Sequence, residues 1–249
     1  MWAAVIAVSP EYRKTSEDMT PEEMVARLLY RDALMLVIDK PAGLAVHRGP
    51  KGGASLEDFF GSLRFGLPRP PSLAHRLDRD TSGCLALGRH RKALAELGRL
   101  FRSGAVGKTY WAVVEGGPAE ATGRIELALG RKDVTRGWWM KVDPNGQPAV
   151  TDWRVLGRGA HSTWLALEPL TGRTHQLRVH CAAMGWPIRG DAVYGTAERG
   201  AALQLHAREL VVPLYRKRDP IRVTAPVPGH MVEELKKCGW VEEVAAPVA

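Results

Sequence analysis

The chain has 249 residues, with 35 basic and 27 acidic side chains and a formal net charge of +8 at pH 7. Apolar residues make up 45% of the chain, enough for a sizeable core, and the basic excess favours a polyanionic partner such as nucleic acid. The three cysteines lie far apart without a CxxC pair, so we expect reduced thiols and a cytoplasmic location. Neither a signal peptide nor an apolar run of about 18 residues is recognisable, and we expect no membrane span.

Hydrophobic periodicity, together with capping and turn residues, predicts the helices and strands in chain order. Thr20 and Glu23 form a capping-box pattern that predicts a helix over residues 20–29. Ser55 is expected to begin a second helix that runs through Leu63. Further helices are predicted over residues 92–102, 174–184 and 230–238, and strands over 34–38, 84–87, 110–114, 151–155, 163–168, 203–206, 208–212 and 221–224.

The predicted strands are scattered among the helices without a regular βαβ period. We therefore expect an α+β fold, in which helices and loops flank a mixed, largely antiparallel central sheet, instead of a doubly wound fold. The chain has no internal repeat, low-complexity stretch or linker. Residues 21–249 are accordingly predicted to form a single domain behind an N-terminal arm of residues 1–20.

Residues 75–83, with the sequence HRLDRDTSG, place a carboxylate among basic side chains. Asp78 lies between Arg76 and Arg79, and His75 is close by. Cations this near favour the ionised carboxylate, which can act as a nucleophile or a general base. The same spacing suits a surface loop whose ion pairs satisfy one another, and the segment alone leaves both interpretations open.

Residues 172–180, GRTHQLRVH, form a second cluster of basic residues. Arg173 lies at the predicted start of a helix, where backbone amides and the helix dipole favour anions. His175 and Arg178 are three residues apart and share one helix face, whereas Leu177 and Cys181 share another. The alternative is a solvated basic face, or a histidine that is satisfied inside the core.

Residues 108–113, KTYWAV, are typical of a strand. Tyr110 and Trp111 must then point to opposite faces, and a tyrosine at a site can stack on a base. A tyrosine in the core is the alternative.

Basic and aromatic residues also alternate between residues 131 and 141, as in segments that grip looped RNA, although a hairpin with tryptophans in the core fits equally. These residues are Arg131, Lys132, Arg136, Trp138, Trp139 and Lys141. Residues 216–218, RKR, are typical of a solvated turn. No nucleotide-binding glycine motif and no metal-ligand spacing occurs, so we expect neither a cofactor nor a metal.

Together the three clusters resemble the RluA family of pseudouridine synthases. Residues 75–83 resemble its HRLDxxTSG motif, residues 108–112 its KxYxA strand, and residues 173–180 its RTHQLRVH helix. Flanking matches are DKPAG at 39–43, GDAVYG at 190–195 and LHA at 205–207. Several motifs in the expected order are far more specific than any one of them.

The resemblance implies a pseudouridine synthase fold and an enzyme that isomerises a uridine in a structured rRNA or tRNA stem-loop by base flipping, without a cofactor. It implies that Asp78 is the catalytic aspartate, that Tyr110 stacks on the uracil and serves in proton transfer, and that Arg178 pairs with Asp78. Leu177 would pack beside the base, and Arg76 would fill the space that the flipped nucleotide leaves. The other expected RNA contacts are His75, Arg79, Lys108, Arg173 and His175.

The sequence departs from the family pattern at Asp39, where the family has asparagine, and in the stretch after residue 207. About thirty residues precede the first motif, so we expect no N-terminal S4 domain, and a monomer that grips RNA with its catalytic domain alone. One alternative is a catalytically silent RNA-binding protein on the same scaffold, which would be favoured by the loss of a site residue. Another is an unrelated cofactor-free hydrolase that uses Asp78 with His75, for which we find no convincing serine or cysteine nucleophile.

Overall fold

The structure, a computed structural model, describes residues 19–49, 52–132 and 139–242, so the predicted N-terminal arm lies outside the described residues apart from its last two. The elements are α1 (Pro21–Ala26), β1 (Leu28–Arg31), β2 (Met35–Lys40), the 3₁₀ helix η1 (Leu56–Phe59), β3 (Ser72–Leu73), β4 (Ser82–Gly88), α2 (Arg91–Arg102), β5 (Gly107–Glu115), β6 (Thr122–Glu126), β7 (Leu129–Arg131), β8 (Met140–Val142), β9 (Val150–Arg158), β10 (Ser162–Pro169), α3 (Gln176–Ala183), β11 (Leu205–Val212), β12 (Ile221–Thr224) and α4 (Gly229–Lys237). Within these ranges, no helix has the length and apolar character needed to cross a membrane.

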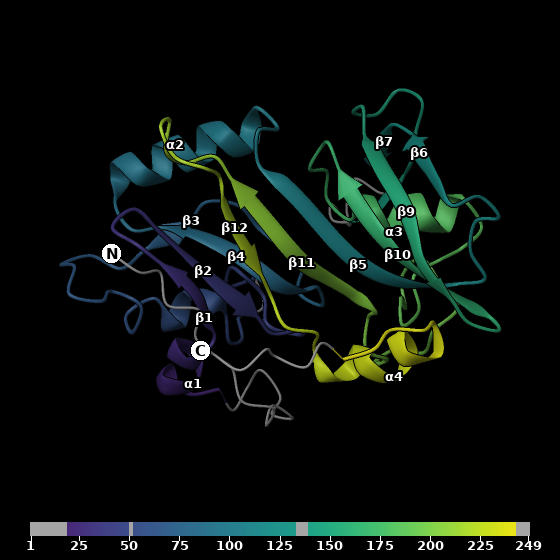
Figure 1. The fold of residues 1–249 in the computed structure, drawn as a ribbon, viewed down its shortest axis with the longest axis horizontal. Helices are drawn as coiled ribbons and strands as arrows, with labels where there is room; N and C mark the ends of the chain where they lie inside the picture. Colours follow the sequence, from purple (N-terminus) through teal and green to yellow (C-terminus); the bar gives the residue numbers. More distant parts are fainter. Residues whose placement is uncertain (1–18, 50–51, 133–138, 243–249) are drawn as a thin grey trace.

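A ten-stranded sheet runs through the molecule in the order β1-β2-β4-β11-β5-β10-β9-β6, with β3 paired to β4 and β12 to β11 (Figure 1). β11 runs parallel to β4, and the other pairings described in this sheet are antiparallel. In Figure 1, α2 lies at the top of the view and α1 and α4 lie at the bottom. The predicted α+β class with a mixed, largely antiparallel sheet is therefore confirmed.

Both faces of the sheet are covered around β2, whose residues are all buried. Leu36 and Ile38 point to one face and pack with residues of α1 and η1. Met35 and Val37 point to the other face and pack with Leu97 of α2. This division follows from the alternation of side chains along a strand, and it explains why residues 35–38 of β2 are apolar without interruption.

β5 is covered on both faces in the same way, and this positions the site. Ala112 and Val114 pack with Leu177 of α3, whereas Val113 packs with α4 on the opposite face. Because side chains alternate along the strand, Tyr110 lies on the same face as Ala112 and Val114. The tyrosine therefore faces the side of the sheet that carries α3.

The predicted helix over residues 20–29 is too long. Its capping box at Thr20 is confirmed, but α1 ends at Ala26, and Leu28 begins β1 opposite Ile38 of β2. Short apolar runs fit a helix or a strand equally, and here pairing with the neighbouring strand decided between them.

Two further predictions need correction. Ser55 begins a short 3₁₀ helix and not an α-helix through Leu63; the apolar spacing arises because Leu56 and Leu63 are both buried in the core beneath the sheet. The two strands predicted over residues 203–206 and 208–212 are one strand, β11, whose register shifts between Ala207 and Glu209. Such a bulge interrupts the alternation of side chains and imitates a strand boundary in the sequence.

The described ends of the basic and aromatic stretch, residues 131–132 and 139–141, lie in or beside the paired strands β7 and β8. Lys132 donates its backbone N–H to the Trp139 carbonyl at 2.7 Å, and its ammonium lies 5.3 Å from the centre of that ring. Arg136 and Trp138 lie outside the described residues. The described residues thus pair as in a hairpin, but Trp139 is only partly buried and does not belong to the core.

Candidate active site

A pocket of about 480 Å³ opens between the loop before β4, the start of β5 and the first turn of α3. Every predicted site residue except Arg79 lines it. These residues are His75, Arg76, Asp78, Lys108, Tyr110, Arg173, His175, Leu177 and Arg178. The fold therefore brings three clusters that are far apart in the sequence to one place.

The fully buried residue Lys40 holds the backbone of the loop that carries Asp78. The Lys40 ammonium donates to the carbonyl of Arg79 at 2.9 Å, and to the carbonyls of Pro41 and Leu44 at 2.7 and 2.8 Å. The Arg79 carbonyl also accepts the N–H of Gly43, and Arg79 Nε donates back to the Gly43 carbonyl, each at 2.9 Å. Arg79, predicted to contact RNA, is thus tied to the turn of residues 41–43.

Burial lowers the pKa of Lys40 to about 7, while the carboxylates of Asp80 and Asp78 act in the opposite direction. Above the lysine, the N–H of Thr81 donates to the Asp78 carbonyl at 3.2 Å and closes the loop. The Asp78 side chain is 23% exposed, so its carboxylate remains accessible from the pocket.

Gly83 allows this loop to approach the centre of the sheet. Its φ is +107°, and a Cβ atom there would lie 2.3 Å from the carbonyl oxygen of Ala207. Ala207 pairs with Gly83 on one side and with Tyr110 on the other. A side chain at position 83 would therefore push apart the strands that bring Asp78 and Tyr110 together.

His75 supports the pocket wall. Its Nε2 accepts the N–H of Ala86 at 3.0 Å, and its ring stacks on Phe101 with 4.2 Å between the ring centres. Burial, and then the charge of Lys108, lower the pKa of His75 to about 3. The acceptor nitrogen of this neutral imidazole is already used by the Ala86 N–H, so His75 cannot act as a general base together with Asp78. This geometry disfavours the hydrolase alternative.

Tyr110 and Trp111 point to opposite faces of β5, as predicted. Tyr110 lines the pocket, whereas Trp111 packs edge-to-face on Trp164 beneath α4. Burial, followed by the Asp78 carboxylate, raises the pKa of Tyr110, so the phenol stays protonated at neutral pH. Lys108, two residues earlier, lines the same pocket, and burial lowers its pKa.

α3 begins at Gln176, and its N-cap is His175 and not Thr174 as predicted. His175 adopts a left-handed conformation with φ +52°, which is uncommon for a residue with a side chain. This conformation turns the chain so that the next residues enter the core. Leu177 packs with Cys181 in the core around β5, so the predicted face shared by these two residues is confirmed.

Arg178 forms its ion pair with Asp191 and not with Asp78, contrary to what the resemblance implied. Its Nε and Nη2 donate to the two oxygens of Asp191 at 2.7 and 2.8 Å. Asp191 also accepts the N–H groups of Val193 and Tyr194 at 2.9 and 3.0 Å. Burial opposes ionisation of Asp191, but these hydrogen bonds and the Arg178 charge hold its pKa below the usual value.

Basic side chains surround the pocket. Arg76 is exposed at the pocket wall, and Arg102, from the end of α2, also lines the pocket. Arg173 Nε donates to the carbonyl of Pro148 at 3.1 Å, which fixes this side chain against the neighbouring loop. The pocket therefore combines one accessible carboxylate with a positively charged surround.

Sequence reasoning gave no role to Lys40, Asp191 or Tyr194, although the flanking motifs contain all three. Their partners are backbone groups and site residues, which spacing alone does not reveal. The Asn-to-Asp departure at Asp39 also has a physical reason, because this buried carboxylate pairs with Arg27 at 3.1 Å. Among the described residues, no cluster of three or more His, Cys, Asp or Glu side chains could hold a metal ion.

Comparison with known proteins agrees with this site. Residues 34–183 match the family described as RNA pseudouridylate synthase. An uncharacterised RNA pseudouridine synthase of Zymomonas mobilis is 44% identical over 209 residues, which cover 82% of this chain and 95% of that protein. Ribosomal large subunit pseudouridine synthase C of Vibrio cholerae is 36% identical over 223 residues, 84% of this chain and 68% of that protein.

The same relationship appears among solved structures. Human RNA pseudouridylate synthase domain containing 4 superposes with a TM-score of 0.75 at 28% identity, covering 88% of this chain and 95% of that one. The resemblance to the RluA family inferred from the motifs is thereby confirmed. The chain belongs to the RNA pseudouridylate synthase family and is an RNA pseudouridine synthase.

Proposed function

We propose that this enzyme isomerises a uridine in a stem-loop of ribosomal RNA, with Asp78 as its reactive group. The observation that carries the proposal is the convergence of Asp78, Tyr110 and Arg178 on one pocket. Ribosomal RNA is the substrate class we favour because relatives such as the Vibrio cholerae protein are named for the large ribosomal subunit. We assign the activity to residues 21–249 as one catalytic domain.

The reaction requires the uridine to leave its stack, because the base must turn about its sugar. The bond from N1 to C1′ breaks, the uracil rotates, a bond forms from C5 to C1′, and the C5 proton is lost while N1 gains one. Product and substrate are isomers, so no oxidant, reductant or energy source is consumed. An ionised Asp78 serves each available route, by attack on C1′, by attack on the base, or by removal of the 2′ proton.

The other pocket residues have distinct parts in this proposal. Tyr110, a phenol that keeps its proton, offers a flat apolar face for the uracil and a hydroxyl for proton transfer. Leu177 lies beside the base, and Arg178 supplies positive charge near Asp78 while Asp191 holds it in place. Arg76, exposed at the wall, fills the space in the RNA from which the nucleotide is flipped.

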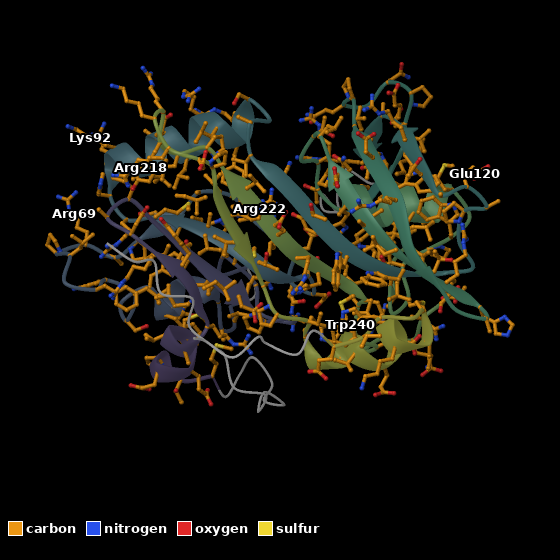
Figure 2. All side chains as sticks on the ribbon, in the orientation of Figure 1. Arg69, Lys92, Glu120, Arg218, Arg222 and Trp240 are labelled. Atoms are coloured by element: carbon orange, nitrogen blue, oxygen red, sulfur yellow. The ribbon has the colours of Figure 1, made fainter. Side chains whose placement is uncertain are left out.

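We propose that the RNA backbone binds along a basic edge of the molecule that leads to the pocket. Residues 216–218 form an exposed turn between β11 and β12, and the charge of Arg216 acts on Glu96 of α2, so the turn and the helix are neighbours. Figure 2 shows Lys92 at the outer margin of this edge, and Arg218 is an exposed residue of the turn whose guanidinium lies 5.0 Å from the centre of the Tyr215 ring. Arg102 continues the edge from α2 into the pocket wall.

Pseudouridine mapping of total RNA from cells with and without the gene tests the proposal. We expect one or more ribosomal sites to disappear in the deletion and to return with the wild-type gene but not with Asp78→Asn. The variant keeps every basic residue, so its RNA affinity should remain close to that of the wild type. Loss of sites in transfer RNA alone would refute the substrate, and activity of Asp78→Asn would refute the catalytic role.

A further inference from the structure

His175, which lines the pocket, and Tyr194, which contacts this histidine, are two side chains that the reaction described above leaves without a role. His175 Nε2 lies 3.9 Å from Oδ2 of Asp78, and the histidine side chain is only 9% exposed. On the other side of the ring, Nδ1 lies 2.9 Å from the Tyr194 hydroxyl. The imidazole therefore stands between the tyrosine and the proposed catalytic carboxylate.

The proton on the Tyr194 hydroxyl can be placed by counting donors. The backbone N–H of Met140 donates to the Tyr194 oxygen at 3.0 Å, so that oxygen already accepts one hydrogen bond. Burial raises the pKa of Tyr194, and the phenol keeps its single proton at neutral pH. The adjacent acceptor is Nδ1 of His175, and a hydroxyl has one proton to donate.

The tautomer of His175 follows from this placement. Burial lowers the pKa of His175, so the ring is neutral at neutral pH and carries one proton. When Nδ1 accepts from Tyr194, the ring proton resides on Nε2, the nitrogen that faces Asp78. The opposite tautomer would turn a lone pair toward the carboxylate.

The other charged groups near His175 do not replace it beside the Asp78 carboxylate. The charges that act on the imidazole are those of Asp78, Arg178, Asp191 and Asp80. Arg178 uses Nε and Nη2 on Asp191, and its guanidinium lies 5.2 Å from the centre of the Tyr194 ring. Among the described residues, His175 is thus the basic side chain whose ring nitrogen lies beside Asp78, 3.9 Å from its carboxylate oxygen.

We propose that His175 is a positioning residue that directs its Nε2–H to the Asp78 carboxylate, and that Tyr194 holds His175 in the tautomer this requires. The inference rests on the catalytic role proposed for Asp78. A separation of 3.9 Å is longer than a hydrogen bond, and catalytic hydrogen bonds are often long in the absence of substrate and tighten in the substrate complex. The left-handed backbone of His175 is consistent with a functional constraint at this residue.

Tyr194→Phe is the direct test, with single-turnover pseudouridine formation measured from pH 6 to 8. We expect the rate at pH 8 to fall about tenfold, the scale of one hydrogen bond to a charged group. The deficit should shrink toward pH 6, because a protonated imidazole carries a proton on both nitrogens and needs no tautomer selection. Removing the donor to Nδ1 also raises the pKa of His175, which widens this recovery.

Tyr215→Phe is the matched control. It also removes one tyrosine hydroxyl, which donates to Asp32 at 2.8 Å, and Tyr215 does not line the pocket. Its rate should equal that of the wild type at every pH. A deficit of Tyr194→Phe that is absent, or equal at all pH values, would overturn the inference, since damage to the fold would not depend on the tautomer.

His175 itself is tested by two substitutions of similar size that share the same backbone penalty. His175→Gln keeps an N–H donor near the position of Nε2, whereas His175→Leu removes it. The glutamine variant should be about tenfold faster than the leucine variant, at equal thermal stability. Equal rates would refute a donor role.

¹⁵N chemical shifts of the histidine rings provide a measurement that does not depend on activity. They should show His175 with its proton on Nε2 in the wild type and a mixture of tautomers in Tyr194→Phe. A proton on Nδ1 in the wild type would overturn the inference. If Asp78→Asn remains active, the proposed role of Asp78 fails; if that variant is inactive while Tyr194→Phe is fully active, only the present inference fails.

Discussion

Asp191→Asn is expected to destabilise the fold strongly, because it removes the charge that compensates Arg178 in the interior. The substitution keeps the shape of the side chain and leaves one oxygen for the N–H groups of Val193 and Tyr194. What it removes is the negative partner of a guanidinium whose side chain is 6% exposed, from a carboxylate that is fully buried. The change therefore removes the charge, and with it one of the two oxygens that accept from Arg178, while the size of the side chain stays the same.

The magnitude follows from burial. Breaking a buried, bidentate pair by removing one partner costs about 3–5 kcal/mol, because a buried charge is left without compensation. A matched control is available on the surface, where Arg124 donates to both oxygens of Asp152 with side chains 52% and 34% exposed. Solvent screens that pair, so Asp152→Asn should change the free energy of unfolding by only a small fraction of the Asp191→Asn loss.

Urea denaturation, followed by circular dichroism, measures both variants against the wild type. We expect a much lower midpoint for Asp191→Asn with an unchanged slope, and a midpoint near that of the wild type for Asp152→Asn. Arg178→Met combined with Asp191→Asn should recover part of the loss, since the uncompensated charge is then gone. Equal effects of the two single substitutions would refute the importance of burial.

Three further outcomes are expected. Tyr110→Phe should slow single-turnover pseudouridine formation by about a hundredfold or more while RNA affinity is kept, and an unchanged rate would exclude a proton role for the hydroxyl. The logarithm of the RNA binding constant should fall linearly with the logarithm of salt concentration, with a shallower slope for Lys92→Glu; a flat dependence in the wild type would contradict a basic RNA-binding edge. Burial lowers the pKa of His206 to about 3, below its usual value near 6.5. The folded state therefore favours the neutral imidazole, and this contribution to the free energy of unfolding is complete above pH 6.5 and is lost as the pH falls toward 3. The free energy of unfolding should therefore decrease between pH 6.5 and 5 by up to about 1.4 kcal/mol per pH unit from this group, and His206→Gln should show a smaller decrease.

Local chemistry made several elements predictable from the sequence. The capping box of Thr20 and Glu23 begins α1, and strand-like alternation separates Tyr110 from Trp111 as expected. The end of α1 was not predictable in the same way. Leu28 leaves the helix because it pairs with Ile38, and a partner strand is not visible in a local pattern.

The site shows the same division. The sequence by itself identified the family through ordered motifs, and these motifs predict that Asp78, Tyr110 and Arg178 belong to the site. Only the tertiary structure decided which groups touch: Arg178 pairs with Asp191, Lys40 holds the backbone of the Asp78 loop, and Tyr194 contacts His175. The physical reason is that hydrogen bonds and ion pairs depend on distance and direction in space, and burial sets their strength. Spacing along the chain determines neither of these for residues brought together by a folded sheet.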